Sequence, residues 1–188
     1  MAFFTGKGDQ GTTKLFDTKS GVRVPKSSLV FEALGMLDEL NTLVGWCKVA
    51  CPEDFDVQGH LGKELLHDVQ DCLFTIQAEV AGAQKFVPHS NTNAMSALIT
   101  TLEKSLPEVK TFLVPGGTEL SSRFDITRAV ARRVERRLVA LHESGERVVS
   151  ESSRAYANRL SSLFYALTRL VNYRAGVSEK PPSYRGSS

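Results

Sequence analysis

The sequence predicts an all-α protein, an up-and-down bundle of about five helices that follows a glycine-rich amino-terminal arm. Apolar residues recur at three- and four-residue spacing through most of the chain after the arm, which is the pattern of amphipathic helices. Residues 1–27 lack this period and are rich in Gly, Thr and Lys. The 188 residues fit a single domain with its own core. We expect an arm over residues 1–27, a bundle over 28–176 and a tail over 177–188 that is mobile or lies over a neighbour.

The expected helices follow from the apolar pattern and from the residues that interrupt it. The first ends before Pro52, and Ser121 or Ser122 is a candidate N-cap of the fourth. The five expected spans are residues 28–49, 58–83, 93–106, 121 or 122 to 144, and 150–175. In the arm we expect short extended pieces that form a loose hairpin around residues 14–16, and we expect no strand elsewhere.

The composition excludes several classes of protein. A formal net charge of +2 is too small for a general binder of nucleic acid or of a membrane surface. No apolar run approaches the ~20 residues of a transmembrane helix, and the first residues lack the pattern of a secretory signal. The three cysteines fit buried, reduced thiols. We therefore expect a cytoplasmic protein.

The stretch TRAVARRVERRL concentrates positive charge on the fourth helix. Arg128, Arg132 and Glu135 follow one another at i, i+4 and i+7, so they form one row beside the apolar stripe. Charges at that boundary are partly desolvated and need partners, and Glu135 can neutralise one arginine. The remaining guanidinium donors suit an oligophosphate, although structural ion pairs are an alternative. Arg133 and Arg137 point elsewhere and are expected to be solvated.

The arm contains a second group of residues that suit phosphate. The stretch TGKGDQGTT, which starts at Thr5, has three Gly and three Thr, and Lys14 and Lys26 follow it. Glycines let backbone amides approach a phosphate, and hydroxyl groups and lysines add donors. The pattern GxxxxGK[ST] is absent, so this is not a Walker motif. A flexible terminus is the alternative, whereas one triphosphate bound by the arm and the arginine row would explain both features.

Asn158 lies in the stretch YANRLSSLF, on the otherwise apolar fifth helix. An amide at this position can contact a ribose or the edge of a base. A core amide with satisfied hydrogen bonds is an equal alternative, and the residues alone leave both interpretations open.

Five blocks of sequence together carry a resemblance to a known family. In order they are TGKGDQGTT, VPKSSLVFEALGMLDELN, FLVPGGTELSS, TRAVARRVERRL and NRLSSLF. The chain resembles the PduO-type ATP:cob(I)alamin adenosyltransferases over residues 4–173. The resemblance implies a homotrimer of helical bundles with active sites between adjacent subunits. It implies transfer of the 5′-deoxyadenosyl group of MgATP to cob(I)alamin or a related corrinoid, with release of triphosphate.

The resemblance also assigns roles to residues by position. The residues expected to bind ATP are Thr5, Gly6, Gly8, Asp9, Gly11, Thr12, Thr13, Lys14, Lys26, Arg132, Glu135, Arg136 and Asn158. The residues expected to contact the corrinoid are Phe112, Val114, Asp125 and Ser162. The expected catalytic set is Arg132, Arg128, Asp38 and Phe112, in which Arg128 pairs with Asp38 across the subunit interface. Mg²⁺ enters with ATP, and no protein ligand to a metal is expected.

The expected reaction needs no protein nucleophile, because cob(I)alamin is itself a strong one. The protein has to place C5′ over cobalt and to stabilise the charge that grows on the leaving triphosphate. A bulky apolar residue such as Phe112 would exclude a lower axial ligand and make Co(II) easier to reduce. Spacing alone predicts instead that Phe112, which enters a PGG turn, anchors the core. A reductase and an adenosylcobalamin-dependent acceptor enzyme are the implied partners.

Four positions depart from the pattern of the family. Gly6 stands where the arm usually has Lys, and Asp125 where the fourth helix usually has His. Ser162 and Leu163 stand where Asp and Tyr are usual. These departures bear on corrinoid contacts and nucleotide affinity more than on the fold. An ATP-binding paralogue that serves regulation or interaction without adenosyl transfer is therefore an alternative, and a purely structural oligomer is a third hypothesis.

Overall fold

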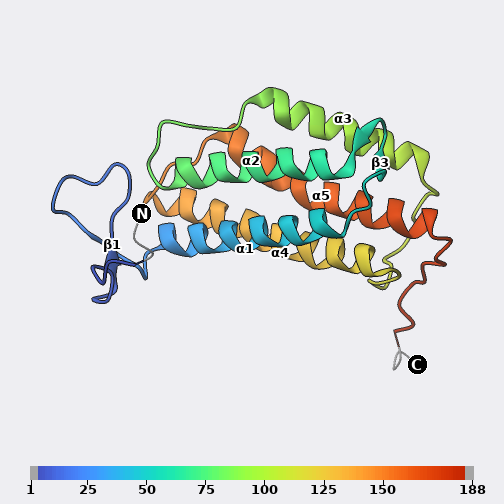
Figure 1. Cartoon of the computed structure of the whole chain (residues 1–188), viewed down its shortest axis with the longest axis horizontal. Coiled ribbons are helices and arrows are strands. Elements are labelled where there is room, and N and C mark those ends of the chain that lie inside the picture. The colour runs from blue at the N-terminus through green and yellow to red at the C-terminus, as the bar shows by residue number, and fades with distance from the viewer. Residues whose placement is uncertain (1–3, 185–188) are drawn as a thin grey trace.

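A computed structural model describes residues 4–184 and has the predicted helical bundle as its main feature (Figure 1). The helices in that range are α1 (Leu29–Ala50), α2 (Gly62–Val80), α3 (His89–Ser105), α4 (Glu119–Ser144) and α5 (Glu151–Arg174). The strands are β1 (Thr12–Thr13), β2 (Val24–Pro25), β3 (Asp56–Val57) and β4 (His60–Leu61). The first three residues of the predicted arm and the last four of the predicted tail lie outside the described residues. Within the described range, no helix is both long and apolar enough to cross a membrane.

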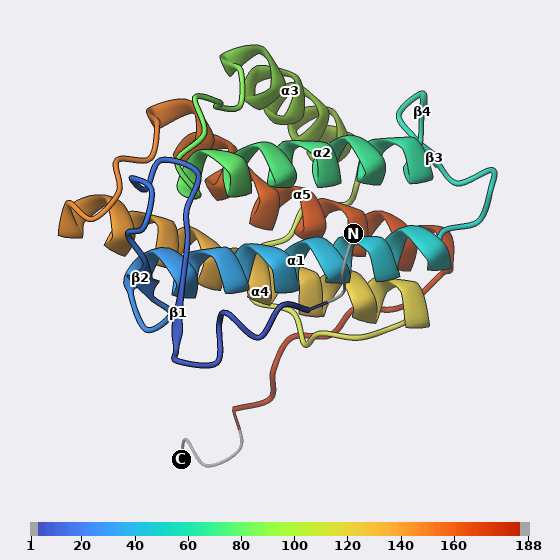
Figure 2. The same ribbon diagram turned by 60° about the vertical axis from the view of Figure 1, so that its left-hand side comes forward.

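The helices pack as neighbouring pairs around one apolar core. α1 contacts α2 and α4, and α5 contacts α4 and α3, which places α3 at the edge of the bundle (Figure 2). The apolar stripes supply the largest fully buried side chains, among them Leu37, Leu40, Leu73, Ile76, Phe124, Leu138, Leu160 and Phe164. Because each such side chain contributes about 1.5–3 kcal/mol on burial, this core holds the helices in register.

Three helix starts differ from the prediction. α2 begins at Gly62, because a β-hairpin takes up the residues before it, and α3 begins at His89. The N-cap of α4 is Thr118, so neither predicted cap is correct. Thr118 and Ser121 form a capping box in which Ser121 N donates to Thr118 Oγ1 (3.1 Å) and Thr118 N donates to Ser121 Oγ (2.8 Å).

The β3–β4 hairpin contradicts the expectation that no strand lies outside the arm. The two strands pair antiparallel and are joined by Gln58 and Gly59, whose φ angles are 54° and 87°. Positive φ at both central residues is the mark of a two-residue type I′ turn. In the arm, β1 pairs antiparallel with β2, and the connection between the two strands contains residues 14–16, so the predicted hairpin is confirmed.

Cys47, Cys51 and Cys72 are buried and free, as predicted. Burial raises the pKa of the Cys51 thiol to about 11. Thiolate is therefore scarce at neutral pH, and the reactive form of this side chain is suppressed.

Glu79 of α2 is a buried carboxylate that joins α2 to the start of α5. It accepts hydrogen bonds from Ser150 N (2.7 Å) and from the Ser153 hydroxyl (2.5 Å). Ser153 Oγ in turn accepts from Val87 N (3.2 Å). A negative charge is favourable at a helix N-terminus. Glu79 thus fixes the relative positions of α2, α5 and the connection between α2 and α3.

We expect Glu79→Ala to lower the free energy of unfolding by about 2–4 kcal/mol, because it leaves two donors without their acceptor. Urea denaturation measures the change. Asp68→Ala, at an exposed position on the same helix, is the matched control and should stay within about 0.5 kcal/mol of wild type. Equal stability of the two variants would contradict this role of Glu79.

Candidate functional site

The predicted arginine row lies along α4, at its border with α5. Arg128 Nε is 3.5 Å from Asp125 Oδ1, one turn earlier on the same helix. Glu135 accepts a hydrogen bond from Asn158 Nδ2 of α5 (2.5 Å). Among the described residues of one chain, Glu135 makes no ion pair with an arginine, so the expected neutralisation is not found there. Asn158 is exposed, which also excludes the interpretation of Asn158 as a core amide.

Arg132 and Arg136 form an uncompensated pair of cations on α4. Both side chains are exposed, and no carboxylate among the described residues lies within ion-pair distance of either one. Arg136 Nη1 donates to the backbone carbonyl of Arg132 (3.1 Å), which holds the two residues together. Two free guanidinium groups one turn apart suit an anion with several oxygens.

Arg133 and Arg137 project toward α1, where each finds a glutamate. Arg133 Nη2 donates to both carboxylate oxygens of Glu39 (2.8 and 2.9 Å), and Arg137 Nε lies 3.4 Å from Glu32 Oε1. All four side chains are about half exposed. The predicted surface position of these two arginines is confirmed, and the pairs add a link between α1 and α4.

Asp38 is exposed on α1 and makes no ion pair with Arg128 within the chain. Arg128 Nε is buried and makes no hydrogen bond. The pair that the resemblance implies joins two subunits, so it stays a prediction.

The tip of the arm is held together by Arg23, a residue that sequence analysis missed. Arg23 Nη2 donates to the carbonyl oxygens of Lys7 (2.7 Å) and Thr12 (2.5 Å), and its Nε donates to Thr12 Oγ1 (2.8 Å). Lys26 N donates to the Gly11 carbonyl (2.8 Å). A Cβ added at Gly8 would lie 3.0 Å from Lys26 Nζ. The lysine ammonium therefore lies directly over this glycine. The tip of the arm thus brings a cation close to the glycine-rich backbone, an arrangement that suits phosphate.

The base of the arm is anchored to the bundle by a second set of contacts that sequence analysis missed. Arg147 follows α4 and donates to both oxygens of Asp17 (2.5 and 3.1 Å). Phe16 N donates to the Ala81 carbonyl at the end of α2 (2.9 Å). Gly82 has a φ of 97°, and a Cβ there would clash with the Asp17 side chain. These hydrogen bonds from Arg147 lower the pKa of the Asp17 carboxyl below its ordinary value.

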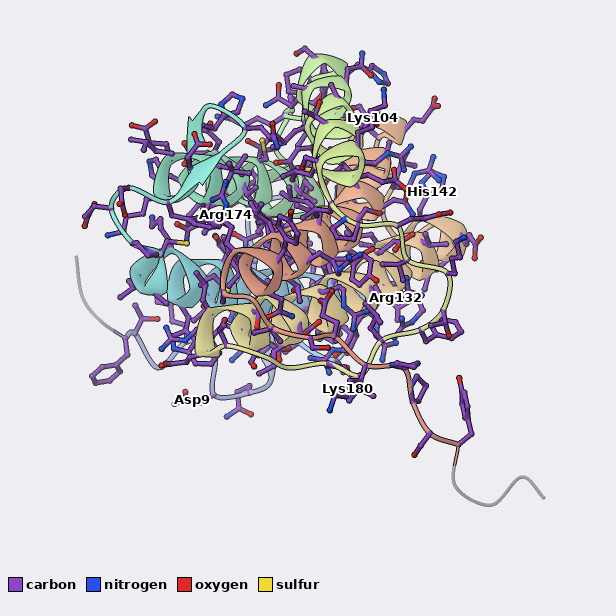
Figure 3. All side chains as sticks on the ribbon, turned by 90° about the vertical axis from the view of Figure 1, so that its right-hand side faces the viewer. Asp9, Lys104, Arg132, His142, Arg174 and Lys180 are labelled. Atoms are coloured by element: carbon purple, nitrogen blue, oxygen red, sulfur yellow. The ribbon has the colours of Figure 1, made fainter. Side chains whose placement is uncertain are left out.

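Within one chain, the structure does not bring the arm and the arginine row together. Figure 3 shows Asp9 of the arm and Arg132 of α4 well apart. Figure 1 shows the arm at one end of the bundle and the loop of residues 107–118 at the other. The single triphosphate site expected from both features is therefore not formed by one chain alone.

The loop of residues 107–118 presents Phe112 to solvent. The Phe112 residue is 80% exposed, and Val114 is 53% exposed. The expectation from spacing that Phe112 anchors the core is wrong. Exposed apolar side chains on a loop between α3 and α4 are available to a ligand or a second chain.

The structure gives physical reasons for the residues that depart from the family pattern. Gly6 has a φ of 67°, a left-handed conformation that lysine rarely adopts. Asp125 Oδ2 accepts a hydrogen bond from Gly116 N (3.1 Å), which ties the 107–118 loop to α4. Ser162 is exposed on α5, whereas Leu163 is fully buried in the core. Three of the four departures thus fit local geometry, and nothing in the structure explains Ser162.

A family model described as cobalamin adenosyltransferase matches residues 3–171 of this chain. The chain belongs to the cobalamin adenosyltransferase family. The corrinoid adenosyltransferase of Bacillus subtilis (strain 168) is 34% identical to it over 184 residues, 95% of this chain and 91% of the relative. Corrinoid adenosyltransferase PduO of Citrobacter freundii is 37% identical over 182 residues, 93% of this chain. This chain spans 51% of the length of that relative.

Solved structures of the family have the same fold. A variant of the PduO-type ATP:corrinoid adenosyltransferase from Lactobacillus reuteri, complexed with cobalamin and ATP, matches with a TM-score of 0.84 and 26% identity. The match covers 97% of this chain and 99% of that one. Another variant, complexed with ATP, gives a TM-score of 0.83 at 28% identity over 95% and 99% of the two chains. The resemblance found in the sequence is confirmed.

We expect Asp17→Asn to loosen the base of the arm at neutral pH. The pKa of Asp17 is lowered in the fold, so the contribution of its pair with Arg147 is present above the ordinary pKa of 3.8 and is lost as the pH falls below it. Exchange of the Phe16 amide, followed by NMR, should be severalfold faster in Asp17→Asn at pH 7, and the difference from wild type should shrink on acidification. Asp54→Asn, exposed at the other end of the bundle, is the control. A Phe16 amide that exchanges equally in all three proteins would contradict the anchor.

Proposed function

We propose that this protein transfers the 5′-deoxyadenosyl group of MgATP to cob(I)alamin, or a related corrinoid, and releases triphosphate. Family membership and the names of the relatives support the proposal. The observation that carries it is the exposed pair of Arg132 and Arg136, which lack a carboxylate among the described residues while Arg133 and Arg137 beside them are paired. Guanidinium groups left free in this way suit a triphosphate.

The residues of the chain would act by position and charge. Arg132 stabilises the negative charge that grows on triphosphate as the C5′–O bond breaks and the Co–C bond forms. Glu135 orients the Asn158 amide through their hydrogen bond (2.5 Å), so that the remaining donor of the amide can meet the nucleoside. Lys26 and the amides of the arm tip hold the phosphates of MgATP. Phe112 offers an apolar surface that excludes water and a lower axial ligand from cobalt.

We place the site between adjacent subunits of a homotrimer. The base of the arm is bound to Arg147, just after the end of α4, and the 107–118 loop is bound to Asp125, near its start. A helix of 26 residues is about 39 Å long at 1.5 Å per residue. If the arm comes from one subunit and the loop from the next, both can reach the same bound MgATP and corrinoid. Neither segment then has to extend along the whole of α4. The proposal includes a cytoplasmic location, a reductase that supplies the electron and an adenosylcobalamin-dependent acceptor enzyme.

The test of the function is an anaerobic reaction of the purified protein with MgATP and chemically reduced cob(I)alamin. The expected result is the absorption spectrum of adenosylcobalamin together with one triphosphate released for each adenosyl group. Binding of ATP without either product would exclude adenosyl transfer and favour the regulatory or interaction paralogue. Gly6 and Ser162 depart from the family pattern, so the ATP-binding paralogue without adenosyl transfer is the alternative that this experiment has to exclude.

We expect Arg132→Ala to lower kcat by about 10²–10³-fold, because the guanidinium acts on charge that develops in the transition state. Its free energy of unfolding should stay within about 0.5 kcal/mol of wild type, since the residue is exposed and unpaired in the free chain. Arg133→Ala removes the neighbouring arginine, which is paired with Glu39, and should leave kcat near wild type. Equal kcat in the two variants would assign Arg132 to structure.

We expect Asp38→Asn to weaken the trimer by about 1.5–3 kcal/mol, because Arg128 of the next subunit would lose one charged partner and keep Asp125. Sedimentation equilibrium measures the change. Glu39→Gln alters the adjacent residue, which pairs within the chain, and should leave assembly intact. A wild-type protein that sediments as a monomer would remove the interface and the proposed location of the site.

A further inference from the structure

We propose that Arg169, Asn172, Glu179 and Asp125 are positioning residues that clamp both ends of the 107–118 loop and so hold Phe112 toward the corrinoid. The part of this inference that concerns the corrinoid rests on the proposed function. The clamp itself is a property of the free chain. It joins α4, α5 and the segment that follows α5.

The start of the loop is held by Arg169 of α5. Arg169 Nη2 donates to the Pro107 carbonyl (3.0 Å), and its Nε donates to Glu179 Oε2 (2.5 Å). The side chains of this ion pair are only 10% and 16% exposed. A buried arginine needs both a counter-charge and acceptors for its other donors. Glu179 supplies the charge, and the loop backbone supplies an acceptor.

The end of the loop is held at a single residue, Gly116, from two helices. Its N–H donates to Asp125 Oδ2 of α4 (3.1 Å), and its carbonyl accepts from Asn172 Nδ2 of α5 (3.2 Å). Asn172 Nδ2 also donates to Glu179 Oε1 (3.1 Å). The next residue, Gly117, has a φ of 146°, and a Cβ there would clash with the Asn172 amide. Glycine is therefore required for this close approach.

The segment after α5 completes the clamp. Val114 N donates to the carbonyl of Lys180 (2.9 Å), and Lys180 lies below Arg132 in the view of Figure 3. Glu179 and Lys180 belong to the tail that the sequence led us to expect as mobile or lying over a neighbour. Glu179 instead accepts hydrogen bonds from Arg169 and Asn172 of α5, and the Lys180 carbonyl accepts one from the loop.

The clamp leaves the tip of the loop exposed while fixing its ends. Phe112 is 80% exposed between the two clamped ends. An aromatic side chain on an unrestrained loop would lose conformational freedom on meeting a ligand, and a fixed frame removes part of that cost in advance. Asp125 also lies 3.5 Å from Arg128. Asp125, which holds Gly116, is therefore also in contact with Arg128, which we place at the subunit interface.

The test compares Glu179→Gln with Glu108→Gln, a control in the same loop whose exposed carboxylate pairs with Lys110. In the ligand-free protein, exchange of the Val114 and Gly116 amides, which donate to Lys180 and Asp125, should be about tenfold faster in Glu179→Gln and unchanged in the control. The Kd for cob(II)alamin with MgATP present should rise by about tenfold, and the Kd for ATP alone should not change. Gly117→Ala, which displaces Asn172 without altering charge, should reproduce both effects.

Amide exchange rates in the loop that equal those of wild type in both Glu179→Gln and Gly117→Ala would overturn the clamp. An ATP affinity that falls as much as the cob(II)alamin affinity would also overturn it, because a general loss of structure would then explain the result. A wild-type protein that forms no adenosylcobalamin would overturn the proposed function instead. The exchange measurement would still decide in that case whether these residues hold the loop.

Discussion

The proposed site depends on an uneven neutralisation of charge along α4. Five arginines lie within its central turns, and α1 supplies glutamates to two of them, Arg133 and Arg137. Asp125 lies beside Arg128, and Glu135 is occupied by Asn158. Arg132 and Arg136 are left without a carboxylate among the described residues. Exposed cations in this arrangement stabilise a polyanion more than they stabilise the fold, because the empty protein offers them nothing to pair with.

Two segments with fixed bases and exposed tips surround this charge in the proposed assembly. The arm is anchored by Asp17 and Arg147, and its tip is tied by Arg23. The 107–118 loop is anchored through Gly116 and leaves Phe112 exposed. Binding segments on a rigid scaffold can order on their substrate without unfolding the bundle. The bases lie at opposite ends of the same chain (Figure 1), so a second subunit is the simplest source of the missing half.

The sequence predicted the bundle well because apolar periodicity is a local property. Leu37, Leu73 and Leu138 lie in the predicted helices and are fully buried. Helix starts were less accurate, since a threonine three residues before Ser121 makes an equally good cap and only the backbone decides between them. The β3–β4 hairpin was missed because its Gln-Gly turn lacks the usual Asn-Gly or Asp-Gly signal.

The candidate site was predicted only where residues on one helix act together. The row of Arg128, Arg132 and Glu135 on α4 follows from helical spacing, whereas the anion site that it was expected to form stays a prediction. The partner of Glu135 could not be derived, because Asn158 is on another helix and its exposure depends on how α5 packs. Arg23, Arg147 and Arg169 were missed for the same reason. Each acts through contacts with residues far away in the sequence, and no local pattern records such contacts.

The most direct test of a site shared between subunits is complementation in mixed trimers. Gly11→Val disables the arm tip, because a β-branched residue is strained at a φ of 71°. Arg132→Ala disables the charged row, and each variant alone should be inactive. The two chains are then mixed in equal amounts and reassembled. Random assembly should restore roughly a quarter of wild-type activity, because about a quarter of the interfaces combine an intact arm from one chain with an intact arginine row from the other. Mixed trimers that stay inactive would contradict the shared site and require both parts to come from one chain.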